Sequence, residues 1–145
     1  MRFYLGSDHA ALDLRRFLAG VLAGRGDTVV EEIGPASPEE RSDYPDVAAT
    51  LCRKLLEDGE AFGILVCGSG QGMAMTANRF RGIRAAVCGE PYSARMARAH
   101  NDANVLCLGQ RVVGFGVAEA ILEAFCGAAF EGGRHEPRVA KIEAL

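Results

Sequence analysis

The feature that most constrains this chain is the stretch from Ala61 to Met73, AFGILVCGSGQGM. Its first half is an apolar, strand-like run that ends at Cys67, and three glycines follow at alternate positions. We therefore predict a strand, a tight loop and then a helix from Met73 to Phe80. Such a junction directs backbone N–H groups and the positive end of a helix at the space above the strand, which favours an anion or a developing oxyanion.

Several known loop motifs come close to this stretch, and each of them fails. A GxGxxG dinucleotide fingerprint from Gly68 needs glycine where Met73 stands, and a GxSxG elbow around Ser69 needs glycine at positions 67 and 71. A phosphate loop needs lysine after the glycines, and a Cys-x5-Arg loop needs arginine at position 73. What remains is a glycine-rich anion-binding turn with a thiol at its entrance.

Cys67 has two interpretations. Cysteines at strand ends are usually packing residues, because cysteine is among the most buried residue types. The helix start predicted behind Cys67 instead favours the thiolate, which would make it a base or a nucleophile. The five cysteines are widely spaced without a CxxC pair, which argues against disulfides and a zinc site, and we expect the other four to be packing residues.

Length and charge narrow the class of protein. A chain of 145 residues with 49% hydrophobic content is enough for one domain, which we assign to residues 1–145. The net charge of −3 and the absence of a basic run argue against a nucleic-acid partner. No apolar stretch approaches the ~20 residues of a membrane span. Because the chain opens directly into a predicted strand, with no signal-peptide pattern, we expect a cytoplasmic protein.

Strand and helix patterns alternate five times, which predicts an α/β fold. We expect a Rossmann-like three-layer sandwich with a five-stranded parallel sheet. The strands are predicted at residues 2–6, 28–33, 61–67, 82–88 and 104–108. The helix after the last strand is expected to turn Val117, Ile121, Ala124 and Phe125 inward, and a short helix from Pro137 to Leu145 is expected to end the chain.

Polar side chains gather at the ends of the predicted strands. Ligands of such sheets bind beyond the carboxyl ends of the strands, so Asp8, His9, Cys67 and Arg111 are expected to lie at one edge.

Two further polar groups lie outside the strand ends. The run from His100 to Asn104 is unusually polar, and it suits a helix C-cap as well as a binding site. Arg134 and Arg138 would form a fork for a phosphate dianion if a helix begins before Pro137. Otherwise they form a solvated basic tail, which is the commoner role for such spacing.

Eight short motifs run through the chain in a fixed order. They are Gly6-Ser7-Asp8-His9, Asp43-Tyr44-Pro45, Cys67-Gly68-Ser69-Gly70, Gly82-Ile83-Arg84-Ala85, Glu90-Pro91-Tyr92-Ser93-Ala94, His100-Asn101-Asp102, Arg111-Val112-Val113-Gly114 and Glu131-Gly132-Gly133-Arg134-His135. With these motifs the chain resembles the ribose-5-phosphate isomerase B family from residue 2 to the tail. The resemblance implies a metal-free and cofactor-free aldose–ketose isomerase that interconverts ribose 5-phosphate and ribulose 5-phosphate. It also implies active sites shared across a homodimer interface; whether dimers pair into tetramers stays open.

The resemblance also implies roles for individual residues. Cys67 would be the base that moves a proton between C2 and C1 through an enediolate, and His100, assisted by Asp8, would open the furanose ring. The developing oxyanion would be stabilised by the Ser69 hydroxyl and the loop amides of Gly68, Gly70, Gln71 and Gly72. Tyr44 would contact the sugar, and the phosphate would be held by His9, Arg111, Arg134 and Arg138. Asn101 and some of the phosphate-binding residues would come from across the dimer interface.

Two departures from the family pattern and two alternatives accompany this interpretation. One branch of the family uses a glutamate six residues after the cysteine position as its base; Met73 stands there, which leaves Cys67 as the candidate. Ser69 replaces a threonine common in the cysteine branch, and the hydroxyl is kept.

The substrate could instead be allose 6-phosphate, galactose 6-phosphate or erythrulose 4-phosphate. An alternative from another class is a non-catalytic sugar-phosphate sensor.

Overall fold

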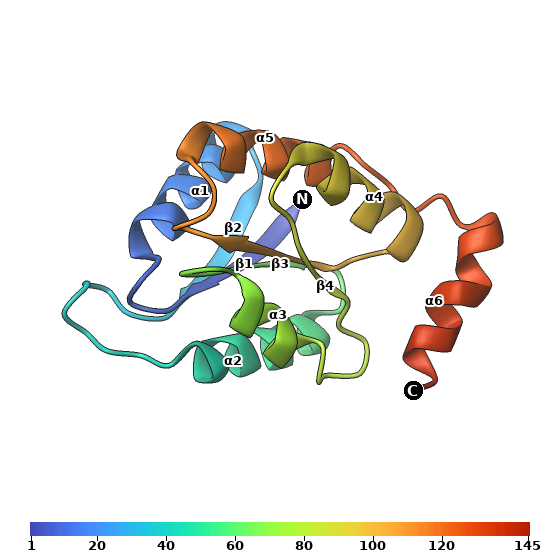
Figure 1. The fold of residues 1–145 in the computed structure, drawn as a ribbon, viewed down its shortest axis with the longest axis horizontal. Helices are drawn as coiled ribbons and strands as arrows, with labels where there is room; N and C mark the ends of the chain where they lie inside the picture. The colour runs from blue at the N-terminus through green and yellow to red at the C-terminus, as the bar shows by residue number, and fades with distance from the viewer.

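A five-stranded, all-parallel sheet lies between two layers of helices in the computed structural model, which describes residues 1–145 (Figure 1). The elements are β1 (Arg2–Ser7), α1 (Leu12–Gly24), β2 (Thr28–Ile33), α2 (Tyr44–Asp58), β3 (Phe62–Cys67), α3 (Gln71–Ala77), β4 (Ala85–Val87), α4 (Pro91–Asn101), β5 (Val105–Gly109), α5 (Phe115–Cys126), the 3-10 turn η1 (Gly133–His135) and α6 (Glu136–Glu143). The strand order is β2-β1-β3-β5-β4. The predicted Rossmann-like α/β fold is therefore confirmed.

The two faces of the sheet carry separate hydrophobic cores. Helices α1, α4 and α5 cover one face, and α2 and α3 cover the other (Figure 1). Along the central strand β3, Ile64 and Val66 pack on the first side, while Leu65 and Cys67 pack on the second. Because successive side chains of a strand alternate between faces, a strand buried on both faces is apolar throughout. This burial explains the unbroken apolar run before the cysteine.

The carboxyl ends of β1 and β2 are tied together by a buried arginine from α1. The Arg15 guanidinium donates to the Ser7 hydroxyl at 3.1 Å, to the Ile33 carbonyl at 3.1 Å and to the Pro35 carbonyl at 2.9 Å. Its Nε also pairs with Glu32 at 3.0 Å. These bonds satisfy a buried charge and hold the Ser7 side chain, next to Asp8, against the end of β2.

The fourth strand is much shorter than predicted. Residues 82–88 were expected to be extended, but β4 covers Ala85–Val87 alone. Gly82 has a φ of 87° and donates its N–H to the Glu143 carboxylate, and its carbonyl accepts from the Asn104 side chain. Side chains therefore take the backbone bonds that a neighbouring strand would have made.

The bounds of two helices differ from the prediction, and a third helix buries a different set of residues. Helix α3 begins at Gln71 and ends at Ala77, earlier at both ends than the predicted 73–80, and α6 ends at Glu143 rather than at residue 145. In α5 the buried residues are Ala118, Ile121, Leu122 and Phe125. Val117 was expected to face inward but is 46% exposed, because the apolar stripe of α5 starts one residue later.

Helix α6 lies to one side of the sandwich and buries none of its residues (Figure 1). Its last turn is held by Glu143, which pairs with the Arg84 guanidinium and accepts the Gly82 N–H at 2.9 Å. Polar contacts therefore anchor the helix that carries Arg138.

None of the helices combines the length and the apolar character that crossing a bilayer requires.

Candidate active site

A cavity of about 520 Å³ opens at the carboxyl ends of the central strands. It is lined by Asp8, Tyr44, Cys67, Gly68, Ser69, Gly72, Met75, Arg111 and Val112. Strand β1 leads into Asp8, β3 ends at Cys67, and the turn after β5 carries Arg111. Of the four side chains predicted to meet at one edge of the sheet, Asp8, Cys67 and Arg111 therefore line one cavity, and His9 does not.

The Cys67 thiol lies at the buried floor of this cavity, with 4% of the residue exposed. The Gly70 N–H donates to Sγ at 3.1 Å. This N–H reaches the sulfur from the glycine loop that follows β3. A buried thiol with its own donor can act as a base toward a group bound above it.

The glycine loop is pressed against the end of β5. The Gln110 N–H donates to the Cys67 carbonyl at 2.9 Å, and the Arg111 N–H donates to the Gly68 carbonyl at 3.1 Å. Gly70 has a φ of 80° and lies on the Leu108 carbonyl, so any side chain there would be both strained and blocked. The loop geometry therefore depends on close backbone approach between two strand ends.

We expect Gly109→Ala to damage the site through this approach. A Cβ at position 109 would lie 2.7 Å from the Ser69 carbonyl carbon, so the loop that carries Ser69 must move. We expect kcat to fall by at least ~10-fold and stability to fall by about 1–3 kcal/mol. Steady-state kinetics and urea unfolding measure the two effects.

The matched control is Gly116→Ala in α5, where an added Cβ meets nothing within 4 Å. It should leave turnover unchanged and raise stability slightly, since alanine is the better helix former. Equal kinetics for the two variants would show that the loop tolerates displacement.

Asp8 faces the same cavity with an altered proton affinity. Burial raises the pKa of its carboxyl above the ordinary value, while the Ala10 N–H bond and the charges of His9 and Arg111 act in the opposite direction. The Ala10 N–H donates to Asp8 at 3.0 Å. A carboxyl with a raised pKa holds a proton more readily than an ordinary aspartate does.

Sequence reasoning missed two residues that line the cavity. Met75 is 70% exposed and Val112 is 65% exposed, although both are apolar. Val112 directly follows Arg111, and Met75 stands one helical turn after Gly72; these positions are the signals that could have found them. Both side chains add apolar surface to the mouth of a cavity whose other lining is largely polar.

Of the other residues predicted near the cavity, Tyr44 and Gly72 also line it. The Tyr44 ring lies directly against Gly72, where an added Cβ would come within 2.5 Å of it. Gly70 contributes its N–H to the thiol, and Gln71 is exposed at the start of α3. His9 is outside the lining, and its Nδ1 lies 3.0 Å from the Ser42 carbonyl oxygen, with which it can bond.

His100 and Asn101 lie at the opposite edge of the sheet from Cys67. They end α4, which leads into the start of β5 at Val105. In the sheet Val105 pairs with Gly63, whereas Cys67 pairs with Gly109, four residues further along. This separation is ~13 Å along the strands. Within one chain, His100, the predicted ring-opening residue, therefore does not lie near Cys67, the predicted base.

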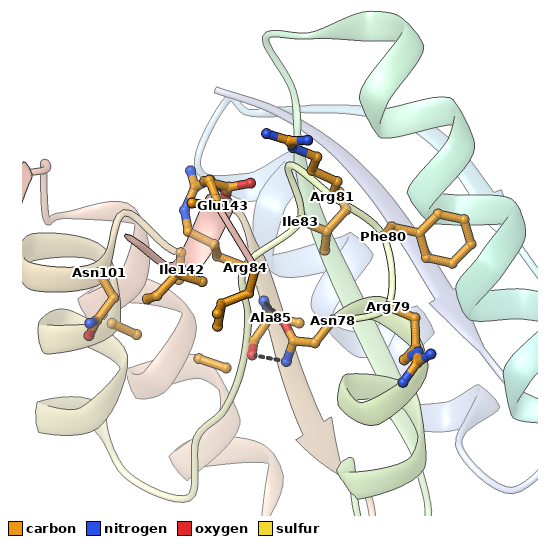
Figure 2. Close-up of a pocket in the computed structure, with 15 residues that line it drawn as sticks. Asn78, Arg79, Phe80, Arg81, Ile83, Arg84, Ala85, Asn101, Ile142 and Glu143 are labelled. Atoms are coloured by element: carbon orange, nitrogen blue, oxygen red, sulfur yellow. Dashed lines mark hydrogen bonds and ion pairs between the residues drawn. The ribbon is translucent and has the colours of Figure 1, made fainter. Parts of the chain in front are cut away.

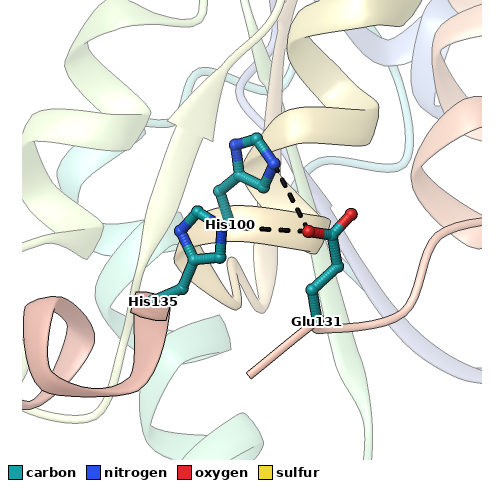
Figure 3. Close-up of side chains that lie close together, drawn as sticks. All are labelled: His100, Glu131 and His135. Atoms are coloured by element: carbon teal, nitrogen blue, oxygen red, sulfur yellow. Dashed lines mark ion pairs between the residues drawn. The ribbon is translucent and has the colours of Figure 1, made fainter. Parts of the chain in front are cut away.

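His100 belongs to a cluster with Glu131 and His135 (Figure 3). The two imidazoles stack with centroids 4.2 Å apart, and their Nε2 atoms lie 3.7 and 3.8 Å from Glu131 Oε2. The Arg134 Nε donates to His135 Nε2 at 3.4 Å. Burial lowers the pKa of His135, and the neighbouring charges of His100, Arg134 and Arg138 act in the same direction. The tail motif thus folds back onto the end of α4.

A larger cavity of about 770 Å³ lies between β4, α4 and α6 (Figure 2). Asn101 lines it together with Arg79, Arg81 and Arg84. The Arg84 guanidinium is already paired with Asp102 and Glu143. Its lining includes no cysteine or histidine, and its one acidic side chain, Glu143, is paired with Arg84, so the smaller cavity that holds Cys67 is the candidate site.

Comparisons with known proteins agree with this geometry. The family profile described as Ribose/Galactose Isomerase matches residues 3–142. Ribose-5-phosphate isomerase B of Escherichia coli is 44% identical over 97% of this chain and 93% of its own length. D-erythrulose-4-phosphate isomerase of Pectobacterium atrosepticum is 43% identical over 95% of this chain and 90% of its own length. A crystal structure of ribose 5-phosphate isomerase from Thermotoga maritima superposes with a TM-score of 0.94 at 45% identity, covering 99% of this chain and 98% of that one. The chain therefore belongs to the Ribose/Galactose Isomerase family.

Proposed function

We propose that this protein is an aldose–ketose isomerase that interconverts D-ribose 5-phosphate and D-ribulose 5-phosphate through an enediolate. The observation that carries the proposal is the buried Cys67 thiol, which accepts the Gly70 N–H at 3.1 Å in a cavity shared with Asp8, Ser69 and Arg111. The 44% identity to ribose-5-phosphate isomerase B of Escherichia coli supports the choice of a pentose phosphate.

In this proposal Cys67 removes the C2 proton of the open-chain aldose and returns it to C1. The hydroxyl proton moves from O2 to O1, so that no atom is gained or lost. The Ser69 hydroxyl and the amides from Gly68 to Gly72 stabilise the charge that develops on oxygen, which is usually the largest catalytic contribution. The scheme requires no metal and no cofactor, because a thiolate base and hydrogen-bond donors suffice.

We propose further that two copies of the chain share each site. We call Asp8, Tyr44, Cys67, Ser69 and Arg111 the cysteine half-site, and we call His100, Asn101, Arg134 and Arg138 the histidine half-site. They lie at opposite edges of the sheet, so a homodimer with twofold symmetry would join each cysteine half-site to the histidine half-site of the second copy. The exposed Met75 and Val112 at the mouth of the cysteine half-site support a covering partner.

In the joined site the sugar phosphate would be held from both sides. His9 and Arg111 would approach its phosphate from one copy, with Arg134 and Arg138 from the other, while His100 opens the furanose ring near Asp8. Tyr44 and Asn101 would contact the sugar. The unpaired cysteines support a cytoplasmic location, where thiols stay reduced.

We expect Arg138→Ala to raise KM by ~10-fold or more and to change kcat much less. A phosphate contact that is equal in the ground and transition states supports binding and leaves the chemical step unaffected. Lys141→Ala is the matched control, because it removes a positive charge from the same exposed helix. A KM that is equal for the two variants would remove Arg138 from the site.

The direct test is turnover of ribose 5-phosphate, compared with allose 6-phosphate, galactose 6-phosphate and erythrulose 4-phosphate, each with and without EDTA. We expect turnover of the pentose that EDTA does not lower. Preference for erythrulose 4-phosphate would favour the second candidate, to which the 43% identity with the Pectobacterium enzyme points. Binding of phosphosugars without any turnover would favour a non-catalytic sensor and contradict the proposal.

A further inference from the structure

The His100, Glu131 and His135 cluster gathers three metal-ligating groups outside the cysteine cavity (Figure 3). One ligand atom from each residue lies within 4.8 Å of the other two. The two contacts to Glu131 Oε2, at 3.7 and 3.8 Å, approach the spacing of about 3.4 Å between ligands of a tetrahedral zinc ion. Small side-chain movements would bring the three atoms onto one ion.

The backbone around the cluster is already fixed. The Glu131 N–H donates to the Ala99 carbonyl at 2.9 Å, which ties the tail to the last turn of α4 next to His100. Gly132 and Gly133 have φ values of 64° and 55°, and the turn they make is closed by the His135 N–H donating to the Gly132 carbonyl at 3.0 Å. Ligands on an ordered backbone lose little conformational freedom when a metal binds.

We propose that His100, Glu131 and His135 bind one borderline divalent cation, with Zn²⁺ as the representative, and that the bound ion inhibits the enzyme. Two imidazoles and one carboxylate select zinc, nickel or cobalt over magnesium and calcium. Three protein ligands leave the fourth position of a tetrahedral ion to water.

Binding has a structural cost and a catalytic consequence. The stacked rings must tilt apart so that both Nε2 atoms point at one ion, and His135 must give up its contact with Arg134. His100 would then be held in place, with the lone pair of Nε2 used for coordination. The inhibition, though not the binding, rests on the proposed function, in which His100 must exchange protons with the sugar.

The first experiment measures binding without any assay of turnover. Equilibrium dialysis of the full chain against chelator-buffered ZnCl₂ should give one zinc per chain. Glu131→Gln and His135→Gln should each raise the dissociation constant for zinc by at least ~10- to 100-fold. Glu119→Gln on α5 removes the same charge elsewhere and should bind zinc like the unmodified chain. Glu131 is exposed, so its variant is expected to fold even if His135→Gln does not.

A second variant separates this cluster from the thiol. Cys67→Ala should still bind one zinc per chain; loss of zinc in Cys67→Ala together with full binding by Glu131→Gln would overturn the proposal. If the chain isomerises a sugar phosphate, saturating zinc should slow it by ~100-fold or more, EDTA should reverse this, and MgCl₂ should have no effect. An enzyme that stays active with zinc bound would contradict the proposed inhibition but not the proposed metal site. A chain that binds zinc but isomerises nothing would contradict the proposed function and leave the metal site standing.

Discussion

Replacing Cys67 with alanine is expected to lower kcat for ribose 5-phosphate by ~100- to 10,000-fold, the range that a general base contributes. The Gly70 N–H donates to this thiol, and position 73, in the first turn of the following helix, holds a methionine that is fully buried in the core and cannot act as a base. Substrate affinity should survive, since the proposed phosphate contacts come from other residues. Proton NMR of the sugar phosphates measures turnover, and calorimetry with a non-reactive pentitol phosphate measures binding.

Cys52→Ala is the matched control for this experiment. Cys52 is a buried cysteine in the same hydrophobic core, and burial raises the pKa of its thiol to about 12, so it stays protonated. Its loss should reduce stability without changing kcat. Near-native turnover by Cys67→Ala would remove the thiol as the base, whereas equal damage from both variants would point to packing rather than chemistry.

The central strand β3 could be predicted because it is buried, and the largely exposed strand β2 could be predicted because its strand-like run ends at a glycine. Strand β2 has the predicted bounds, and β3 differs from its prediction by one residue, because their patterns end at glycine or at clear turn residues. The short β4 could not be predicted in the same way. Its preceding backbone pairs with the side chains of Asn104 and Glu143, which lie about 20 and 60 residues further along the chain. Local patterns carry no information about such distant partners.

The candidate site likewise has one part that could be predicted from the sequence and one part that could not. Asp8, Cys67 and Arg111 could be placed together because each follows a parallel strand, and parallel strands end at one edge. The contact between His100 and His135 depends on the tail folding back onto α4, which no local pattern specifies. The resemblance assigned a role to His100, but the strand register is what separates it from the cysteine within one chain.

This separation makes a second large effect testable. Cys67→Ala and His100→Asn should each be nearly inactive alone, yet their mixture should regain activity once subunits exchange. In a mixed dimer one site carries both lesions and the other carries none. Random pairing of equal amounts makes half of the dimers mixed, so about a quarter of the wild-type activity should return. The measurement is turnover before and after exchange, with the mixed dimer isolated by an affinity tag on one variant.

The double variant Cys67→Ala/His100→Asn, mixed in equal amounts with the wild-type chain, provides the converse control. If each site takes Cys67 from one copy and His100 from the other, both sites of the mixed dimer are broken and about a quarter of the activity of an all-wild-type sample remains. If each chain supplies its own pair, the mixed dimer keeps one intact site and about half remains. If the mixture of the two single variants stays inactive, and the mixture of double variant and wild type keeps half of the activity, His100 must reach Cys67 within one chain. Since the two residues lie at opposite ends of the β3 and β5 pair, that outcome would demand a rearrangement of the sheet itself, so the two mixtures test the fold and the shared site together.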